Sequence, residues 1–382
     1  MSYHNGYPSR SPVPRGLTPN GNSNGHANGQ SNGGAYGNGN GTGNGVANGN
    51  GNGNSAGPSG PQGNNSRVQP LLCSGHTRPV VHLQFSNLLD DGTYMLISAC
   101  KDGSPMLRSW LGDWIGTFIG HKGAVWSTKI SQDTTRGATG GADYFAKIWD
   151  CNSGEELHSF AHKHIVRTVA LNPQSQPQYL LTGGNEKKIR LFDLNRPDAD
   201  PLILGSDPEK SCDGTVRSLV WDDSQGGAVG VSASEDGTVR WWDLRTLSQV
   251  AQLDLGDPVT SMELAHGGGT LSVTAGKNVH FLDILRQHPP VTIPLTHQPT
   301  SASLHPFLRD RFVAGSANDP WVRVYDLDSG TEREVYKGHH GPVLCASYSP
   351  DGEVYASGSE DGTVRLWQTN PGKSYGLWQS QE

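Results

Sequence analysis

One set of side chains that could perform chemistry recurs along the sequence: a histidine, then a serine or threonine, then an aspartate. A hydroxyl, an imidazole and a carboxylate form a nucleophilic triad when the hydroxyl faces a cleft and an oxyanion site. Because the set is repeated, and because Trp149 and Trp367 follow two of its copies, we favour a structural interpretation over a catalytic one. Each copy would be a buried chain of hydrogen bonds from tryptophan through hydroxyl and imidazole to carboxylate, and the protein would not be an enzyme. The three full sets are His76, Ser98 and Asp102; His121, Thr139 and Asp143; and His339, Ser357 and Asp361.

Two further copies are degenerate. The first has His162 and Thr182, but Glu186 and Phe192 stand in place of the aspartate and tryptophan. The second has Ser232, Asp236 and Trp242 and lacks a histidine in its opening loop. We expect both to form weaker versions of the same structure.

The elements that must position these residues are short strands. Near the end of the chain, three alternating apolar runs are separated by turns at Asp351-Gly352 and Asp361-Gly362, a pattern typical of antiparallel strands joined by tight turns. A unit this small cannot bury its own apolar faces, so it must recur. The position six residues after each turn acid, or after its equivalent in weaker copies, recurs about every 40 to 50 residues, the period of WD40 repeats. These positions are Arg108, Trp149, Phe192, Trp242, Leu282, Tyr325 and Trp367. The sequence therefore predicts an all-β fold, a seven-bladed β-propeller, over residues 67–382.

The first 66 residues differ from the rest. They are dominated by glycine and asparagine, and no apolar burial would offset the entropy of ordering them, so we predict a disordered low-complexity tail, either passive or part of weak assemblies. The following residues, Val68 to Leu72, have no complete repeat before them, whereas the last repeat stops at its third strand. We expect them to form the outer strand of the last blade and close the ring.

Composition limits the class of function. The chain carries a formal charge of −7, and since the tail holds Arg10, Arg15 and no acid, the remainder carries −9, which disfavours a general polyanion binder. Five dispersed cysteines predict free thiols in a reducing compartment. No signal peptide or membrane-spanning run is found in the sequence, so we expect a soluble intracellular protein.

Cofactor motifs are weak. His162 and His164 are spaced to share one side of a strand as metal ligands, but no third ligand has a useful spacing. The glycine-rich runs at 183–184 and 267–269 do not open a helix, and there is no phosphate-binding GxxxxGK[ST] motif. We predict neither a cofactor nor a small-molecule substrate.

A partner-binding face is expected where the histidine loops and the acidic turns meet, because alternating strand directions place both on one side of the ring. In the first three repeats this face would carry mostly cations, and a basic arc with an aromatic residue would suit an acidic peptide or a single RNA strand, although an ordinary solvated mixture of charges would have the same composition. The candidate residues are Arg78, Lys101, Lys122, Trp126, Lys163, Arg167, Lys187 and Lys188.

Several runs outside the generic repeat resemble one WD40 family, the serine-threonine kinase receptor-associated or unr-interacting proteins. They cover the propeller but not the tail, and the missing aromatic at Arg108 falls at the family's position. The runs are 72–81, 97–103, 112–118, 161–166, 179–184, 301–306 and 373–378.

The resemblance implies a non-enzymatic scaffold of the survival of motor neuron (SMN) complex, which helps load Sm proteins onto spliceosomal small nuclear RNAs. The implied partners are gemin-like subunits, Sm proteins and an unr-like RNA-binding protein, with RNA contacted indirectly and the protein present in cytoplasm and nucleus. It also implies an adaptor role in transforming growth factor β receptor signalling. The alternatives are a WD-repeat subunit of translation initiation factor three, or a ubiquitin-ligase substrate receptor, which usually carries an appended F-box or similar segment.

Overall fold

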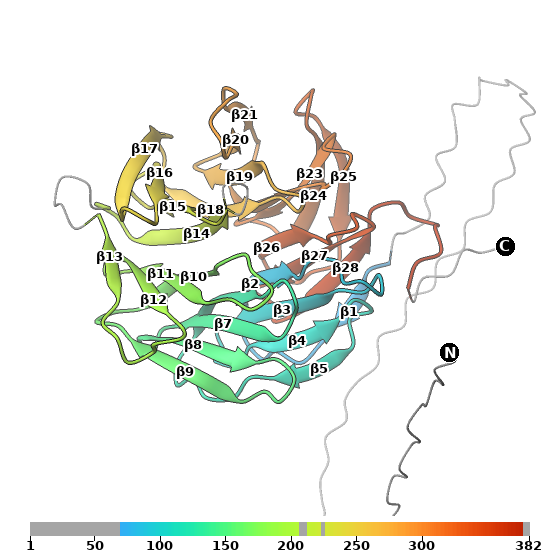
Figure 1. The fold of residues 1–382 in the computed structure, drawn as a ribbon. Coiled ribbons are helices and arrows are strands. Elements are labelled where there is room, and N and C mark those ends of the chain that lie inside the picture. The colour runs from blue at the N-terminus through green and yellow to red at the C-terminus, as the bar shows by residue number, and fades with distance from the viewer. Residues whose placement is uncertain (1–68, 206–211, 223–225, 377–382) are drawn as a thin grey trace, which may run out of the picture. The chain divides into compact units, whose positions relative to one another are not determined.

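The computed structural model describes residues 69–205, 212–222 and 226–376, and every regular element in these ranges is a β-strand. The strands form seven four-stranded antiparallel sheets, which confirms the predicted seven-bladed propeller (Figure 1). We number the sheets as blades 1 to 7. In order from inner to outer strand they are β2 (Val80–Phe85), β3 (Met95–Cys100), β4 (Met106–Ser109), β5 (Trp114–Thr117); β6 (Val125–Ile130), β7 (Arg136–Gly141), β8 (Phe145–Asp150), β9 (Glu156–Ala161); β10 (Val166–Leu171), β11 (Tyr179–Gly184), β12 (Ile189–Asp193), β13 (Leu202–Leu204); β14 (Val216–Asp222), β15 (Val229–Ser234), β16 (Thr238–Asp243), β17 (Ser248–Asp254); β18 (Val259–Leu264), β19 (Thr270–Ala275), β20 (Asn278–Asp283), β21 (Val291–Pro294); β22 (Pro299–Leu304), β23 (Arg311–Ser316), β24 (Trp321–Asp326), β25 (Glu332–Lys337); and β26 (Val343–Tyr348), β27 (Val354–Ser359), β28 (Val364–Gln368), β1 (Leu71–Cys73).

The inner strands form a closed ring. Each one contacts the inner strand of the next blade, and β26 contacts β2. Every inner strand also has a register irregularity just after its first residue, such as the one between Val125 and Ser127 in β6. A bulge of this kind bends the strand and turns the following side chain, here Trp126, out of the regular pattern.

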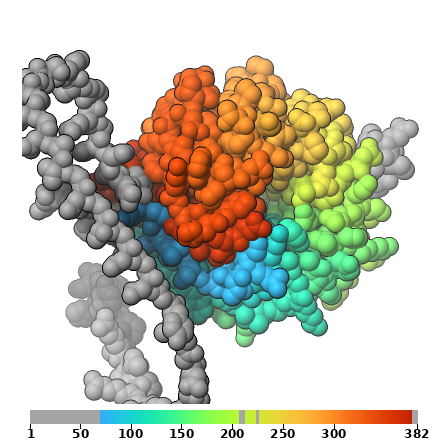
Figure 2. Space-filling model, turned by 180° about the vertical axis from the view of Figure 1, so that it is seen from behind, coloured from blue at the N-terminus to red at the C-terminus, as the bar shows by residue number. Residues whose placement is uncertain are grey.

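The ring is closed by a strand from the beginning of the chain. β1 pairs with β28, with Leu71 opposite Leu366 and Cys73 opposite Val364. The strand lies at 71–73 rather than at the expected 68–72, and Val68 is outside the described residues. Blade 7 is therefore built from both ends of the chain. In the space-filling view, blue residues from the N-terminal part lie directly against red residues from the C-terminal part (Figure 2).

The C-terminal segment adds a second connection between blades 7 and 1. The hydroxyl of Tyr375 donates to Asp351 and lies 2.8 Å from the hydroxyl of Tyr94, and its ring packs against Trp110. Because Tyr94 and Trp110 belong to blade 1 and Asp351 to blade 7, this contact holds the two blades together.

The hydrophobic core lies between blades. One cluster joins Ala138 and Ile148 of blade 2 to Val166 and Leu180 of blade 3, and comparable clusters occupy other blade junctions. The predicted tail lies outside the described residues. In the part of the chain that the structure describes, no helix has the length and apolar character needed to cross a membrane.

Candidate interaction site on the histidine-loop face

Blades 2 and 7 contain the complete hydrogen-bond chains expected from the sequence. In blade 2, Trp149 Nε1 donates to Thr139 Oγ1 at 2.8 Å, the hydroxyl lies 2.7 Å from Nε2 of His121, and Nδ1 of His121 lies 2.9 Å from Asp143. In blade 7, the corresponding distances through Trp367, Ser357, His339 and Asp361 are 2.8, 2.7 and 3.1 Å. Each chain ties the loop before the inner strand to the turn between the second and third strands.

The hydroxyl groups in these chains cannot act as nucleophiles. Thr139 and Ser357 are 0 % exposed, so no substrate reaches them. In blade 7, burial lowers the pKa of His339 to about 4, despite the opposing effect of Asp361, and the ring is neutral near pH 7. Burial opposes the charge on Asp361, but hydrogen bonds from the backbone N–H groups of His340 and Thr363 outweigh it and lower that pKa to about 2.

Blade 3 departs from the expected set. Nε2 of His162 lies 2.8 Å from Thr182 Oγ1, but Nδ1 of His162 bonds to the Phe160 carbonyl at 3.0 Å. Glu186 accepts instead from the backbone of Lys163 and from Arg190. Glu186, whose side chain is longer than that of aspartate, thus accepts hydrogen bonds from the loop backbone and an arginine. The bond between His162 and the turn acid, expected by analogy with the other blades, is absent between these two residues. Phe192 packs on the His162 ring and supplies no N–H to Thr182.

Blades 1 and 4 each replace one member of the chain. In blade 1, His76 bonds to Ser98 at 2.8 Å and to Asp102 at 3.2 Å, while the buried Arg108 donates to the Ser74 carbonyl. In blade 4, Trp242 donates to Ser232 at 2.8 Å, and Asp236 accepts from Arg240 at 3.0 Å and from the backbone of Asp213, the residue after the buried Cys212. In blade 4 an ion pair therefore replaces the imidazole as the partner of the turn acid.

Blade 6 has a histidine that the sequence interpretation missed. His297 is 8 % exposed and stacks on Tyr325, whose hydroxyl lies 3.3 Å from its Nδ1. The spacing in the sequence could have identified this histidine, because His297 precedes Asp319 by 22 residues, the same spacing as between His121 and Asp143. The blade has Ala314 where blades 1 to 4 and 7 have a hydroxyl, so Tyr325 bonds to the imidazole directly.

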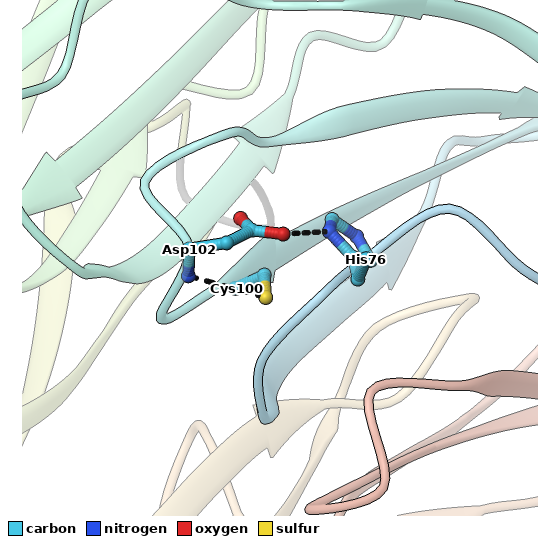
Figure 3. A group of neighbouring side chains, drawn as sticks. All are labelled: His76, Cys100 and Asp102. Carbon is cyan, nitrogen blue, oxygen red and sulfur yellow. Dashed lines mark hydrogen bonds and ion pairs between the residues drawn. The ribbon is translucent and has the colours of Figure 1, made fainter. Parts of the chain in front are cut away.

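One group of side chains has the residue types of a metal site: His76, Cys100 and Asp102 (Figure 3). Both ring nitrogens of His76 are already in hydrogen bonds, and the Cys100 thiol donates to the Arg78 carbonyl at 3.0 Å. Ser359 makes the equivalent bond to the Gly341 carbonyl in blade 7, so the thiol replaces a structural hydroxyl. Burial also raises the pKa of Cys100 to about 12, which opposes the thiolate that a metal requires. This donor set fits a hydrogen-bond network rather than a metal.

His162 and His164, the two possible metal ligands noted in the sequence, do not point toward a common site either. Both ring nitrogens of His162 are in hydrogen bonds, whereas His164 is exposed and lies beside the Tyr144 ring.

The histidine loops and the turns between second and third strands share one side of the ring, which we call the histidine-loop face. Blades 1 to 3 place on it a row of cations, here named the basic arc: Arg78, Lys101, Lys122, Lys163, Arg167, Lys187 and Lys188. All except the half-buried Lys101 and Arg167 are exposed. Among the described residues, none of the seven side chains forms an ion pair, because Asp102, Asp143 and Glu186 accept mainly from histidines, backbone groups or Arg190.

Three residues of the face form what we call the Trp126 stack. The Arg167 guanidinium lies 3.8 Å and the Lys101 ammonium 5.2 Å from the centroid of the Trp126 ring. Cation–π contacts of this kind hold the cations in fixed positions. Trp126 Nε1 has no hydrogen-bond partner among the described residues.

A second arginine near the stack, Arg217, was not included in the sequence analysis. Burial, with a smaller contribution from Arg217, lowers the pKa of Arg167 to about 10. Arg217 itself is paired with Glu235. Glu235 is therefore ion-paired with Arg217 and affects Arg167 only through its charge. Their proximity follows from equivalent positions after the bulge in β10 and β14, which the repeat alignment would have indicated.

Comparison with known proteins gives two findings: this chain contains WD repeats, and it is similar in sequence to one family of WD-repeat proteins. The family model for the WD domain, G-beta repeat, matches residues 112–150, 206–243 and 330–368. The serine-threonine kinase receptor-associated proteins of mouse and human are 47 % identical over 315 residues, covering 82 % of this chain and 86 % of theirs. The protein of that name from Dictyostelium discoideum is 45 % identical over 301 residues, 99 % of its length.

The chain belongs to the serine-threonine kinase receptor-associated protein family. It is a WD40 scaffold that binds other proteins, not an enzyme. Subunit I of eukaryotic translation initiation factor 3 from Bombyx mori is more distant, at 28 % identity over 326 residues, and so this alternative is not favoured.

Proposed function

We propose that this member of the family is a scaffold of the SMN complex and assists assembly of Sm proteins on spliceosomal small nuclear RNAs in cytoplasm and nucleus. Its direct partners are proteins, namely gemin-like subunits, Sm proteins and an unr-like RNA-binding protein, and RNA is contacted through them. The relatives' name further supports an adaptor role beside a serine-threonine kinase receptor, such as that for transforming growth factor β.

The observation that carries the proposal is the basic arc with the Trp126 stack at its centre. Seven cations that form no ion pair with any residue the structure describes lie on one face of a protein whose formal charge is −7. A local basic surface on an acidic protein selects acidic partners and repels most others. An acidic segment of a partner protein could place carboxylates against Arg167 and Lys101.

Affinity purification of the full chain from native extract tests the function. We expect Sm proteins, gemin-like subunits and small nuclear RNA in the bound fraction, with RNA lost when the proteins are first dissociated. Recovery of initiation-factor subunits and ribosomal RNA instead would contradict the proposal.

A charge-reversal pair tests the site. Lys122→Glu with Lys163→Glu should abolish capture, because both side chains are exposed on the arc and their backbone bonds remain. Lys277→Glu with Lys337→Glu is a matched control, since it makes the same change of charge in blades 5 and 6, outside the basic arc. Equal capture by the two double variants would exclude the arc as the docking site.

A further inference from the structure

A cavity of about 500 Å³ lies inside the ring and is separate from the basic arc. It is lined by the inner strands and by the turns that follow them, which lie on the face opposite the histidine loops. Trp126, Arg167 and Arg217 do not contribute to its lining. Its volume is within the range of roughly 300–1,000 Å³ that is typical of ligand pockets.

The interior of the cavity carries one unpaired cation. Lys129 is the only lysine or arginine in its lining, and the ammonium makes no direct hydrogen bond or ion pair with any described residue. Burial lowers the pKa of Lys129 as well, and the nearby Glu263 opposes this shift. The other titratable groups of the lining carry little charge near pH 7, because burial lowers the pKa of His82 to about 3 and of His266 to about 4, and raises the pKa of Glu263 to about 7.

Polar groups elsewhere in the cavity lining also lack partners among the described residues. Glu263 accepts at one oxygen from Ser347 at 2.5 Å, while its other oxygen is buried without a hydrogen bond. The hydroxyl of Ser301, a residue that is 4 % exposed, has no partner among the described residues either. Both residues line the cavity, so both a donor and an acceptor there are available to a ligand.

Exposed apolar side chains lie among polar ones in the turns that line the cavity. Phe307 and Leu88 line it and are 68 % and 49 % exposed, and the neighbouring Leu308 is 57 % exposed. The turn carrying Phe307 is fixed: its N–H donates to Nδ1 of His305 at 3.3 Å, and Arg309 donates to the Gly268 carbonyl at 3.0 Å. Large apolar side chains exposed on a fixed turn are typical of a binding surface.

We propose that this cavity receives the C-terminal end of a partner polypeptide whose last residues are apolar. The terminal carboxylate bonds to the Lys129 ammonium, a peptide N–H near the end donates to the free oxygen of Glu263, and the apolar side chains pack on Phe307, Leu308 and Leu88. A single cation matches one carboxylate, whereas a phosphate usually requires several cationic or N–H donors.

The position of Lys129 favours a chain end over an acidic side chain within a loop. Lys129 lies on β6, inside the ring, and not on one of the turns that also line the cavity. A chain end enters such a cavity as a single strand and brings its own terminal carboxylate, whereas a loop must enter as two strands.

Binding of defined peptides to the full chain tests the proposal. A random peptide library displayed with free C-termini is selected on the protein, and each selected peptide is synthesised as the free acid and as the C-terminal amide. We expect the amide to bind at least about tenfold more weakly, the loss that follows from removing one charge-assisted bond. This comparison needs no variant and is independent of folding effects.

Two variants locate the site. Lys129→Met keeps the length of the side chain but removes the charge, and Phe307→Ser removes the exposed ring; each should weaken the free acid about tenfold. Lys122→Glu, on the basic arc, should leave binding of the peptide in the cavity unchanged. The cavity proposal and the proposed docking site on the histidine-loop face are therefore tested independently of each other. Selection of no peptide, equal binding of acid and amide, or full binding by Lys129→Met would overturn it.

Discussion

Two threonines at equivalent places in neighbouring blades allow the energy of the hydrogen-bond chain to be measured. Thr139 and Thr182 are both 0 % exposed, and each lies 2.7–2.8 Å from a histidine Nε2. Only Thr139 also accepts from a tryptophan, because blade 3 has Phe192 at that place. Replacement of each by valine preserves the shape of the side chain and removes only the hydroxyl.

The expected costs follow from the groups left without a partner. An unsatisfied buried donor or acceptor costs about 1–3 kcal/mol. Thr182→Val leaves one such group, the imidazole of His162, and should lower the free energy of unfolding by about 1–3 kcal/mol. Thr139→Val leaves two, in His121 and Trp149, and should cost about 2–6 kcal/mol.

Urea unfolding, followed by tryptophan fluorescence, and the thermal midpoint measure the difference. The Trp149→Phe background provides the control, because it removes the second partner of Thr139. In that background Thr139→Val should cost no more than Thr182→Val does in the natural chain, which gives a coupling energy of about 1–3 kcal/mol between Thr139 and Trp149. Equal costs for the two threonines, or zero coupling, would refute the idea that the hydroxyl joins the chain.

Two further predictions concern stability. Tyr375→Phe removes the hydroxyl that joins Tyr94 and Asp351, so the thermal midpoint should fall by about 2–6 °C, whereas Tyr179→Phe on the exposed surface should leave it unchanged. The second prediction concerns the pH dependence that His339 produces. In the folded protein its pKa is about 4, so between pH 6.5 and 4 the unfolded chain binds a proton at His339 that the folded protein does not. The contribution of His339 to stability should therefore be constant above pH 6.5 and fall by about 3 kcal/mol as the pH is lowered to 4. Unfolding measured against pH should show a shallower slope for His339→Gln, and an unchanged slope would contradict this assignment.

The fold could be predicted because its determinants are local and repeated. The turn acids, the histidines before them and the aromatic residues after them lie within one blade, at spacings that each repeat preserves. The observed hydrogen bonds differ from the predicted ones in blades where a residue of the repeated set is replaced by one with different hydrogen-bonding groups or length. Glu186 is longer than aspartate and bonds to a backbone group and Arg190 instead of His162, and Tyr325 reaches His297 without a serine between them.

The candidate sites differ in how far the sequence could reveal them. The positions of the basic arc were predictable, because each of its cations lies beside a histidine loop, beside an acidic turn or at the start of an inner strand, and the place of each in the blade is known. The pairing of Trp126 with Arg167 depends on the bulge after the first residue of each inner strand, and the contribution of Arg217 follows only from aligning those bulges. The cavity was not predictable, since Lys129 and Glu263 lie in blades 2 and 5 and approach each other only when the ring closes.

Departures from the sevenfold repeat separate the residues that stabilise the ring from those that can distinguish partners. A hydrogen bond found in several blades, such as that from histidine to the turn acid, stabilises each of those blades in the same way. Such a bond does not distinguish one blade from another as a binding site for a partner. Lys129 and Glu263 have no charged counterparts at the equivalent inner-strand positions, where Gln84, Ala170, Val220, Ser303 and Ser347 lie. A charged side chain facing the interior is costly unless something compensates it. Burial lowers the pKa of Lys129 and Glu263 opposes this only in part, so a bound carboxylate would supply the remaining compensation.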